Sequence, residues 1–259
     1  ARHKIVLLDE ADNMTKKAQQ LVNNLMSQYH NTTRFAFTCN NSSDIIEAIQ
    51  SRCIIFRYLR LNNLQVTYKT IEHCIKNHWN YRISSGIIPL ITLPEANLSI
   101  DILPDKDEIY KEFKKCAEII QKNHIRCSTH PDQFVVPASL NPNTVKKSII
   151  ELEHHADMMD LFGLPRNYDS PINIHMNCYK GSSLEDTANR FIKIYNSLSE
   201  SVKSRLVLEN EDKPNSWKVE ELYDYVHQNT GIPITYDNLH YRCNTGKLNS
   251  TDAVKLAVS

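Results

Sequence analysis

The second part of the chain alternates between short apolar runs and longer segments in which apolar residues recur with helical spacing. We predict strands at residues 81–84, 125–129, 171–174, 205–208 and 232–236. The helical segments around them are residues 64–78, 107–123, 142–162, 185–200 and 217–229. Short strands that alternate with long helices are typical of parallel βα units, so the pattern predicts an α/β fold with a parallel sheet.

The first part of the chain shows the same alternation in shorter form. The pattern predicts strands at 4–8, 34–39 and 54–58 and helices at 15–29 and 44–49, the second helix capped by Ser42 or Ser43. The rhythm changes near Asn62 and Asn63 without a Gly/Ser/Pro-rich linker. We therefore predict two domains, residues 1–61 and 62–259, each of them a piece of something longer. This junction favours a fusion, a frame-joined gene model or an assembled environmental sequence, and a viral or organellar protein that truly fused the two domains is the alternative.

Charge and composition exclude few functions. The chain has 30 basic and 30 acidic residues, so a nucleic-acid site must be a local patch rather than a property of the whole surface. Seven cysteines without CxxC spacing predict reduced, buried thiols. The sequence contains no apolar run long enough to span a bilayer and no signal peptide. We expect a soluble intracellular protein of the cytoplasm or nucleus, or one encoded by a virus, with no membrane partner.

Side chains that can bind metals stand where four consecutive predicted strands end. His130, His175, Glu209 and Asp237 follow these strands, and His240 lies at the start of the next loop. In a (β/α) barrel the carboxyl ends of the strands meet on one face, which would bring these residues together. Imidazoles and carboxylates suit Mn²⁺, Zn²⁺ or Fe²⁺. A single histidine at a strand end is more often a hydrogen-bonded loop residue, but four consecutive strand ends argue against coincidence.

Several motifs in the same part of the chain resemble the UV-damage endonuclease family over about residues 63–250. They are RISS at 82–85, STHPDQF at 128–134, KKSIIELEHHADMMDLFGL at 146–164, INIH at 172–175, LVLENED at 206–212 and ITYDNLHYRCN at 234–244. The resemblance implies a partial TIM-type (β/α) barrel with a cluster of divalent metal ions. It also implies an endonuclease that acts in DNA repair and nicks DNA 5′ to UV photoproducts.

Carried over motif by motif, the resemblance implies that the five strand-end residues named above are metal ligands. Glu209, Asp237 and His175 are the expected catalytic residues among them. The implied cofactors are divalent metal ions, Mn²⁺ first, with Zn²⁺ or Mg²⁺ as alternatives. The implied partner is damaged double-stranded DNA.

The same resemblance implies a DNA-binding set. Gln133 and Phe134 match the Gln-Tyr pair with which the family probes the damaged duplex; the Phe ring keeps the stacking surface but lacks the hydroxyl. Arg82, in the RISS segment, is the further expected DNA-binding residue. A histidine that the family often carries falls at about Leu93 here. The paired His154 and His155 lie inside a predicted helix, and we expect them on the surface or in the packing.

The first part of the chain has a resemblance of its own. KIVLLDEADNMTKKAQQLVNNLM and TTRFAFTCNNSSDIIEAIQSRC are similar to the small subunits of replication factor C, an AAA+ clamp loader. The resemblance implies an AAA+-like α/β fragment in which Asp9 and Glu10 are the Walker B acids, Asn40 or Asn41 the sensor, and Arg52 the arginine finger. Other clamp-loader subunits would then be partners. The sequence contains no GxxxxGK[ST] loop, so we expect no ATP hydrolysis.

Three functions are therefore open: a metal-dependent repair endonuclease, a clamp-loader ATPase fragment, and a metal-dependent sugar isomerase-like barrel. The HPDQF segment favours the nuclease over the isomerase. Five predicted barrel strands leave open sheet edges and an incomplete ligand set, so we expect weak metal binding and slow cutting.

Overall fold

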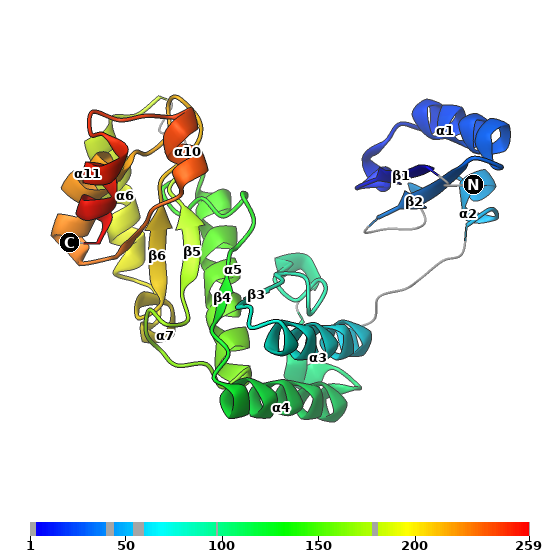
Figure 1. Ribbon diagram of the computed structural model, residues 1–259, viewed down its shortest axis with the longest axis horizontal. Helices are drawn as coiled ribbons and strands as arrows, with labels where there is room; N and C mark the ends of the chain where they lie inside the picture. The colour runs from blue at the N-terminus through cyan, green and yellow to red at the C-terminus, as the bar shows by residue number, and fades with distance from the viewer. Residues whose placement is uncertain (1–3, 40–43, 54–59, 97, 178–180, 259) are drawn as a thin grey trace. The chain divides into compact units, whose positions relative to one another are not determined.

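The computed structural model describes residues 4–39, 44–53, 60–96, 98–177 and 181–258. The chain forms two compact units, which divide between Tyr58 and Leu59, whereas the sequence pattern placed the boundary between residues 61 and 62 (Figure 1). The predicted strand at 54–58, the predicted caps Ser42 and Ser43, and the candidate sensors Asn40 and Asn41 lie outside the described residues.

The first unit is a small α/β arrangement. Strands β1 (Lys4–Leu8) and β2 (Thr33–Phe37) pair in parallel and are joined through helix α1 (Lys16–Tyr29), which Thr15 caps, and the short helix α2 (Glu47–Gln50) follows. Ala11, Ile45 and Ile49 form its buried core. Two strands do not establish an AAA+ fold, so the AAA+ part of the fold prediction is not confirmed by the structure.

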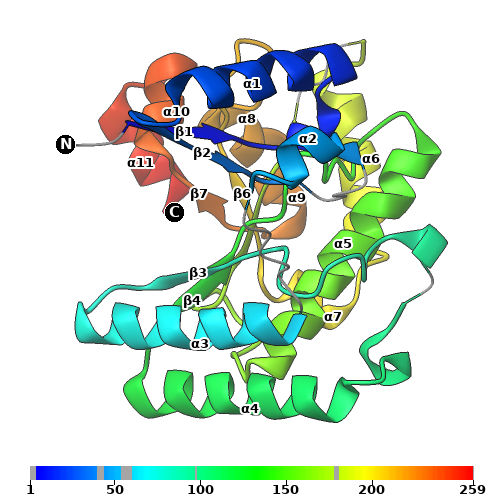
Figure 2. The ribbon, with the colours of Figure 1, turned by 90° about the vertical axis from the view of Figure 1, so that its right-hand side faces the viewer.

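The second unit contains a parallel sheet of five strands in the order in which they occur in the chain. These strands are β3 (Tyr81–Ile83), β4 (Cys127–Thr129), β5 (Ile172–His175), β6 (Leu206–Glu209) and β7 (Ile234–Thr235). Helices separate them: α4 (Lys106–Asn123), α5 (Pro142–Leu161), α6 (Leu184–Tyr195) and α7 (Glu200–Lys203). Helix α3 (Arg60–Lys76) precedes β3 and lies alongside α4 (Figure 2). This repeated βα order is the predicted partial TIM-type barrel.

Two helical predictions needed correction. The predicted helix 185–200 is wrong as a single helix, because α6 ends at Tyr195 and Ser199 starts α7 by accepting a hydrogen bond from the Val202 amide. The predicted helix 217–229 is a run of α8 (Val219–Leu222), a π-helical turn (Tyr223–His227) and α9 (Gln228–Thr230). Helices α10 (Asn238–Cys243) and α11 (Ser250–Ala257) were not predicted at all.

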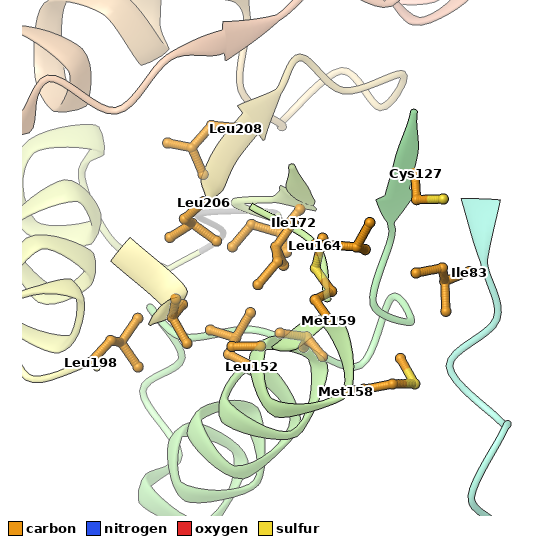
Figure 3. Packing of buried hydrophobic residues seen from close by; sticks show 14 of the residues in the cluster. Ile83, Cys127, Leu152, Met158, Met159, Leu164, Ile172, Leu198, Leu206 and Leu208 are labelled. Carbon is orange, nitrogen blue, oxygen red and sulfur yellow. The ribbon is translucent and has the colours of Figure 1, made fainter. Parts of the chain in front are cut away.

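The core of the second unit lies between the sheet and its helices. Leu152, Met158 and Met159 on α5 are buried in the same cluster as Ile172 on β5 and Leu206 on β6 (Figure 3). Strands β5 and β6 are buried on both faces nearly throughout, which explains the mostly apolar runs of the sequence there. His155 is also fully buried, so of the two expectations for it, packing is correct and surface is wrong.

The described cysteines are free thiols, but they are not uniformly buried. Cys74, Cys116 and Cys127 are buried in the core, as predicted, whereas Cys39 and Cys243 are exposed and contradict the prediction. Cysteine 178 lies outside the described residues. Among the helices of the described ranges, none combines the length and the apolar character needed to cross a membrane.

Candidate metal centre at the carboxyl ends of the strands

The register of the sheet brings the predicted ligands together. In the parallel pairing of β5 with β6, His175 stands directly opposite Glu209. Glu209 in turn pairs with Thr235 on β7, and Asp237 follows two residues later. His130 comes directly after β4. Because parallel strands end at the same edge of the sheet, side chains far apart in the sequence become neighbours there.

Ligand atoms of these residues form two overlapping groups. The first consists of His130, His175 and Glu209, and the second of Glu209, Asp237 and His240. Within each group the candidate ligand atoms lie within 4.8 Å of one another. Glu209 belongs to both groups, so the geometry brings together all five residues that the sequence singled out.

Glu209 is the centre of this cluster. Its carboxylate is buried, accepts a hydrogen bond from the Asn173 side-chain amide, and lies 3.6 Å from Nε2 of His130 and 3.4 Å from Nδ1 of His240. Burial alone would raise the pKa of Glu209, but its interactions with His130, His175 and Asn173 lower it below the usual value. The carboxylate is therefore held in its charged form, in which it can bind a cation.

The pKa values of the two neighbouring histidines shift in opposite directions. The interaction with Glu209 raises the pKa of His130, whereas burial lowers the pKa of His175 and favours its neutral, ligating form. The ring centroid of His175 lies 5.1 Å from that of His130 and 5.3 Å from that of His240. Nδ1 of His175 is buried without a hydrogen-bond partner among the described residues. An orphaned buried ring nitrogen beside a carboxylate fits a metal ligand.

Asp237 and His240 belong to one short helix. The sequence placed His240 in a loop, which is wrong: it lies in α10, and Asp237 is the N-cap of that helix. Oδ1 of Asp237 accepts from the His240 amide at 2.8 Å, and Nδ1 of His240 is 2.9 Å from the carbonyl of Asn210. The cap hydrogen bond brings the two ligand side chains to the same end of the helix, with Oδ2 of Asp237 not used by the cap.

The structure shows positioning residues that the sequence analysis missed. Asn173 donates to Glu209 from within β5. Asn210 accepts from the Asp237 amide at 2.7 Å and donates to the Asp237 carbonyl at 3.0 Å. Glu211 is also buried, which raises its pKa to about 7. In the sequence, Asn173, Asn210 and Glu211 are marked only as polar residues within two positions of a candidate ligand, inside a strand or just after it.

The predicted DNA-binding residues lie on two segments, the turn after β4 and strand β3. Gln133 and Phe134 are the two central residues of a turn that the Val135 amide closes onto the Asp132 carbonyl at 2.9 Å. The side chain of Phe134 is 75% exposed. Arg82 is exposed on β3. The interaction with Glu209 raises the pKa of His130, and the charge of Arg82 partly opposes that rise, so Arg82 lies close enough to act on the cluster.

Of the clamp-loader residues, the structure describes three. Asp9 accepts from the hydroxyl of Thr38, and that hydroxyl also accepts from the Glu10 amide at 3.0 Å. Arg52 donates to Ser27 on α1 at 2.6 Å. Asp9 and Glu10 therefore stand at the end of β1, as a Walker B pair would, while Arg52 is bound within its own unit.

Comparisons with known proteins support the two resemblances unequally. Replication factor C subunit 4 of Schizosaccharomyces pombe is 48% identical over 97 residues, which are 38% of this chain and 28% of that protein. The UV DNA damage endonuclease of Nostoc sp. is 37% identical over 188 residues, 72% of this chain and 54% of that protein. The chain thus spans about half the length of this nuclease relative.

A solved structure and a family profile agree with the nuclease relative. The crystal structure of SacUVDE is similar with a TM-score of 0.68 and 32% identity, and the match covers 77% of this chain and 65% of that one. The profile of the family described as UV-endonuclease UvdE matches residues 21–257, a longer stretch than the motifs alone had indicated. Since this match covers most of the chain, the protein belongs to the UV-endonuclease UvdE family.

Proposed function

We propose that the second unit is a metal-dependent endonuclease module that nicks damaged duplex DNA 5′ to UV photoproducts. The observation that carries the proposal is the pair of three-residue ligand groups that share Glu209 at the carboxyl ends of the strands. Membership of the UvdE family supports the same reaction. The exposed Phe134 ring in the turn after β4 favours the nuclease over the metal-dependent sugar isomerase, because such a ring suits a stacked base better than a small sugar.

The residues present fit divalent metal ions. His130, His175 and Glu209 would hold one ion, and Glu209, Asp237 and His240 a second. Mn²⁺ is the ion we expect first, with Zn²⁺ and Mg²⁺ as alternatives. Bound there, such ions would supply Lewis acidity for in-line displacement at phosphorus.

The protein's own residues prepare the site for that chemistry. Burial keeps His175 neutral, and Asn173 donates to the Glu209 carboxylate and so limits its rotation. Asn210 fixes the backbone of Asp237 through two hydrogen bonds. We assign catalytic roles to Glu209, Asp237 and His175 because all three have carboxylate or imidazole atoms in the cluster.

The substrate part of the proposal depends on three exposed side chains. Phe134 would stack where the damaged bases are unstacked, and Gln133 beside it would hydrogen-bond to the exposed base edges. Arg82 would neutralise a backbone phosphate near the cluster. Damaged double-stranded DNA is therefore the proposed partner. The protein would act in the compartment that holds this DNA, the cytoplasm or the nucleus.

Nicking of supercoiled plasmid tests the proposal. The full chain with Mn²⁺ should convert UV-irradiated plasmid to the open circle faster than unirradiated plasmid, and Glu209→Gln should abolish the difference. Equal rates on both plasmids, or an unchanged rate for Glu209→Gln, would contradict the proposal. A Mn²⁺ titration of the same protein would measure its affinity for the metal. The weak metal binding expected from the sequence stays a prediction until then.

For the first unit we propose a clamp-loader-like segment that binds other clamp-loader subunits and does not hydrolyse ATP by itself. The identity to replication factor C subunit 4 and the place of Asp9 and Glu10 after β1 support this proposal. Phosphate release from ATP should equal the buffer blank, and co-expressed clamp-loader small subunits should co-purify with the chain. Turnover above the blank that Glu10→Gln removes would contradict the first part.

A further inference from the structure

The segment that follows β4 is anchored at several points although its tip is exposed. Pro131, Val135, Pro137 and Ala138 are buried on either side of the exposed tip. The Val136 amide donates to the Ser148 hydroxyl at 2.8 Å, and Arg190 donates to the Ala138 carbonyl at 3.0 Å. The turn that carries Gln133 and Phe134 is therefore built on a fixed base, and we call it the probe turn (residues 132–135).

Asn177 links this base to the metal centre. Its side-chain amide donates to the carbonyl of Val135, which closes the probe turn, at 3.2 Å and to the carbonyl of the ligand His175 at 3.3 Å. One amide group thus bridges the probe turn and the end of a ligand-bearing strand. Because both partners are backbone atoms, the bridge constrains the main chain of both segments rather than one mobile side chain.

Glu211 holds Asn177 in the conformation that this bridge needs. The backbone of Asn177 is left-handed, with φ at 67°, which Asn and Gly adopt more readily than other residues. The backbone amide of Asn177 donates a hydrogen bond to the buried Glu211 carboxylate at 2.6 Å. Glu211 is itself fixed, since its amide donates to the Trp217 carbonyl at 2.9 Å and its carbonyl accepts from Asn244 at 3.1 Å. The buried Glu211 carboxylate therefore fixes the position of Asn177 and does not serve as part of the apolar core.

We propose that Asn177, held by Glu211, is a positioning residue that keeps the probe turn in register with the metal centre. The inference rests on the proposed function, in which the probe turn recognises the lesion and the cluster cuts nearby. A probe that can move by an ångström relative to the cluster loses the alignment on which both recognition and cutting depend. In this proposal Asn177 acts through the two backbone carbonyls that it bridges, those of Val135 and His175.

The test compares Asn177→Gly with Asn167→Gly in the full chain. Glycine can adopt the left-handed backbone at 177, so the substitution removes the side-chain amide without forcing a different backbone conformation. Asn167 is an exposed loop residue before β5, at the opposite end of the strands from the cluster, and serves as the matched control. Glu211→Gln should behave as the parent, because its amide oxygen still accepts from Asn177, whereas Glu211→Ala should resemble Asn177→Gly.

Two measurements decide the outcome. Amide hydrogen exchange of residues 132–136 in the free protein should be about fivefold to tenfold faster in Asn177→Gly than in the control. In EDTA, the preference for a duplex with one photoproduct over an undamaged duplex, read by fluorescence anisotropy, should fall by a similar factor. Unchanged exchange and preference would overturn the inference. A parent chain without any lesion preference would instead refute the proposed function, and the inference about recognition with it.

Discussion

Arg205 offers the sharpest test of how the second unit is held together. Its guanidinium is fully buried at the start of β6, at the end of the sheet opposite the metal centre. It donates to Asp160 at 2.8 Å, to Ser201 Oγ at 2.7 Å, and to the carbonyls of Leu164 and Pro165 at 2.7 and 3.0 Å. One side chain therefore joins the end of α5, helix α7 and strand β6. We expect Arg205→Met to break this junction.

The expected cost follows from what the substitution leaves behind. Removing one partner of a buried ion pair costs about 3–5 kcal/mol, because the remaining groups stay buried without partners. Asp160 remains paired with Arg166 at 2.9 Å, and its side chain is 28% exposed, which reduces the penalty. We therefore expect a loss of about 3 kcal/mol in the free energy of unfolding. With a urea slope of about 2 kcal/mol/M, the midpoint should fall by about 1.5 M.

Urea unfolding followed by tryptophan fluorescence measures this loss. Both tryptophans, Trp79 and Trp217, belong to the second unit, so the signal reports that unit alone. Arg166→Met is the matched control, because Arg166 pairs with the same carboxylate from a side chain that is 60% exposed. Such exposed pairs contribute little to stability because water and salt screen them. The reasoning is refuted if Arg205→Met costs less than 1 kcal/mol, or if both variants cost the same.

Three further predictions concern the site and its surroundings. Asn173→Ala should weaken Mn²⁺ binding roughly tenfold or more, since it removes the donor that orients Glu209; calorimetric titration measures it, and affinity within twofold of the parent would contradict the role. Burial lowers the pKa of His154 to about 4, below its ordinary value of 6.5. The unfolded chain therefore binds a proton at His154 at a higher pH than the folded chain does, and the free energy of unfolding decreases as the pH falls from 6.5 towards 4. His154→Gln should therefore reduce the loss in unfolding free energy between pH 7 and pH 4.5 by about 2 kcal/mol in urea titrations, and an identical pH profile would count against it. Phe134→Ala should change stability by less than about 0.5 kcal/mol while lowering affinity for damaged duplex about fivefold or more in anisotropy titrations; equal affinity would remove Phe134 from the interface.

Much of the fold could be predicted from the sequence because the second unit follows a regular repeat. Predicted strand 205–208 and observed β6, Leu206–Glu209, differ by one residue at each end. Predicted helix 142–162 and α5, Pro142–Leu161, differ at one end. Both elements are apolar where neighbouring elements cover them, so their period is visible without tertiary information. The break between α6 and α7 was missed because a serine cap competes only locally with helical spacing.

The sequence by itself determined which side chains could form the candidate metal centre, since four of the five candidate ligands stand at or just past the end of a strand and His240 follows shortly after the last of them. It did not determine how they are held. The register that places His175 opposite Glu209, the cap that joins Asp237 to His240, and the Asn177 bridge to the probe turn all depend on segments far apart in the chain. Likewise, only the tertiary structure shows that Arg205 is buried and joined to Asp160. Hydrophobic periodicity is a local property that can be read directly from the sequence. A hydrogen bond between polar groups far apart in the chain forms only when the chain folds, so the sequence pattern does not reveal it.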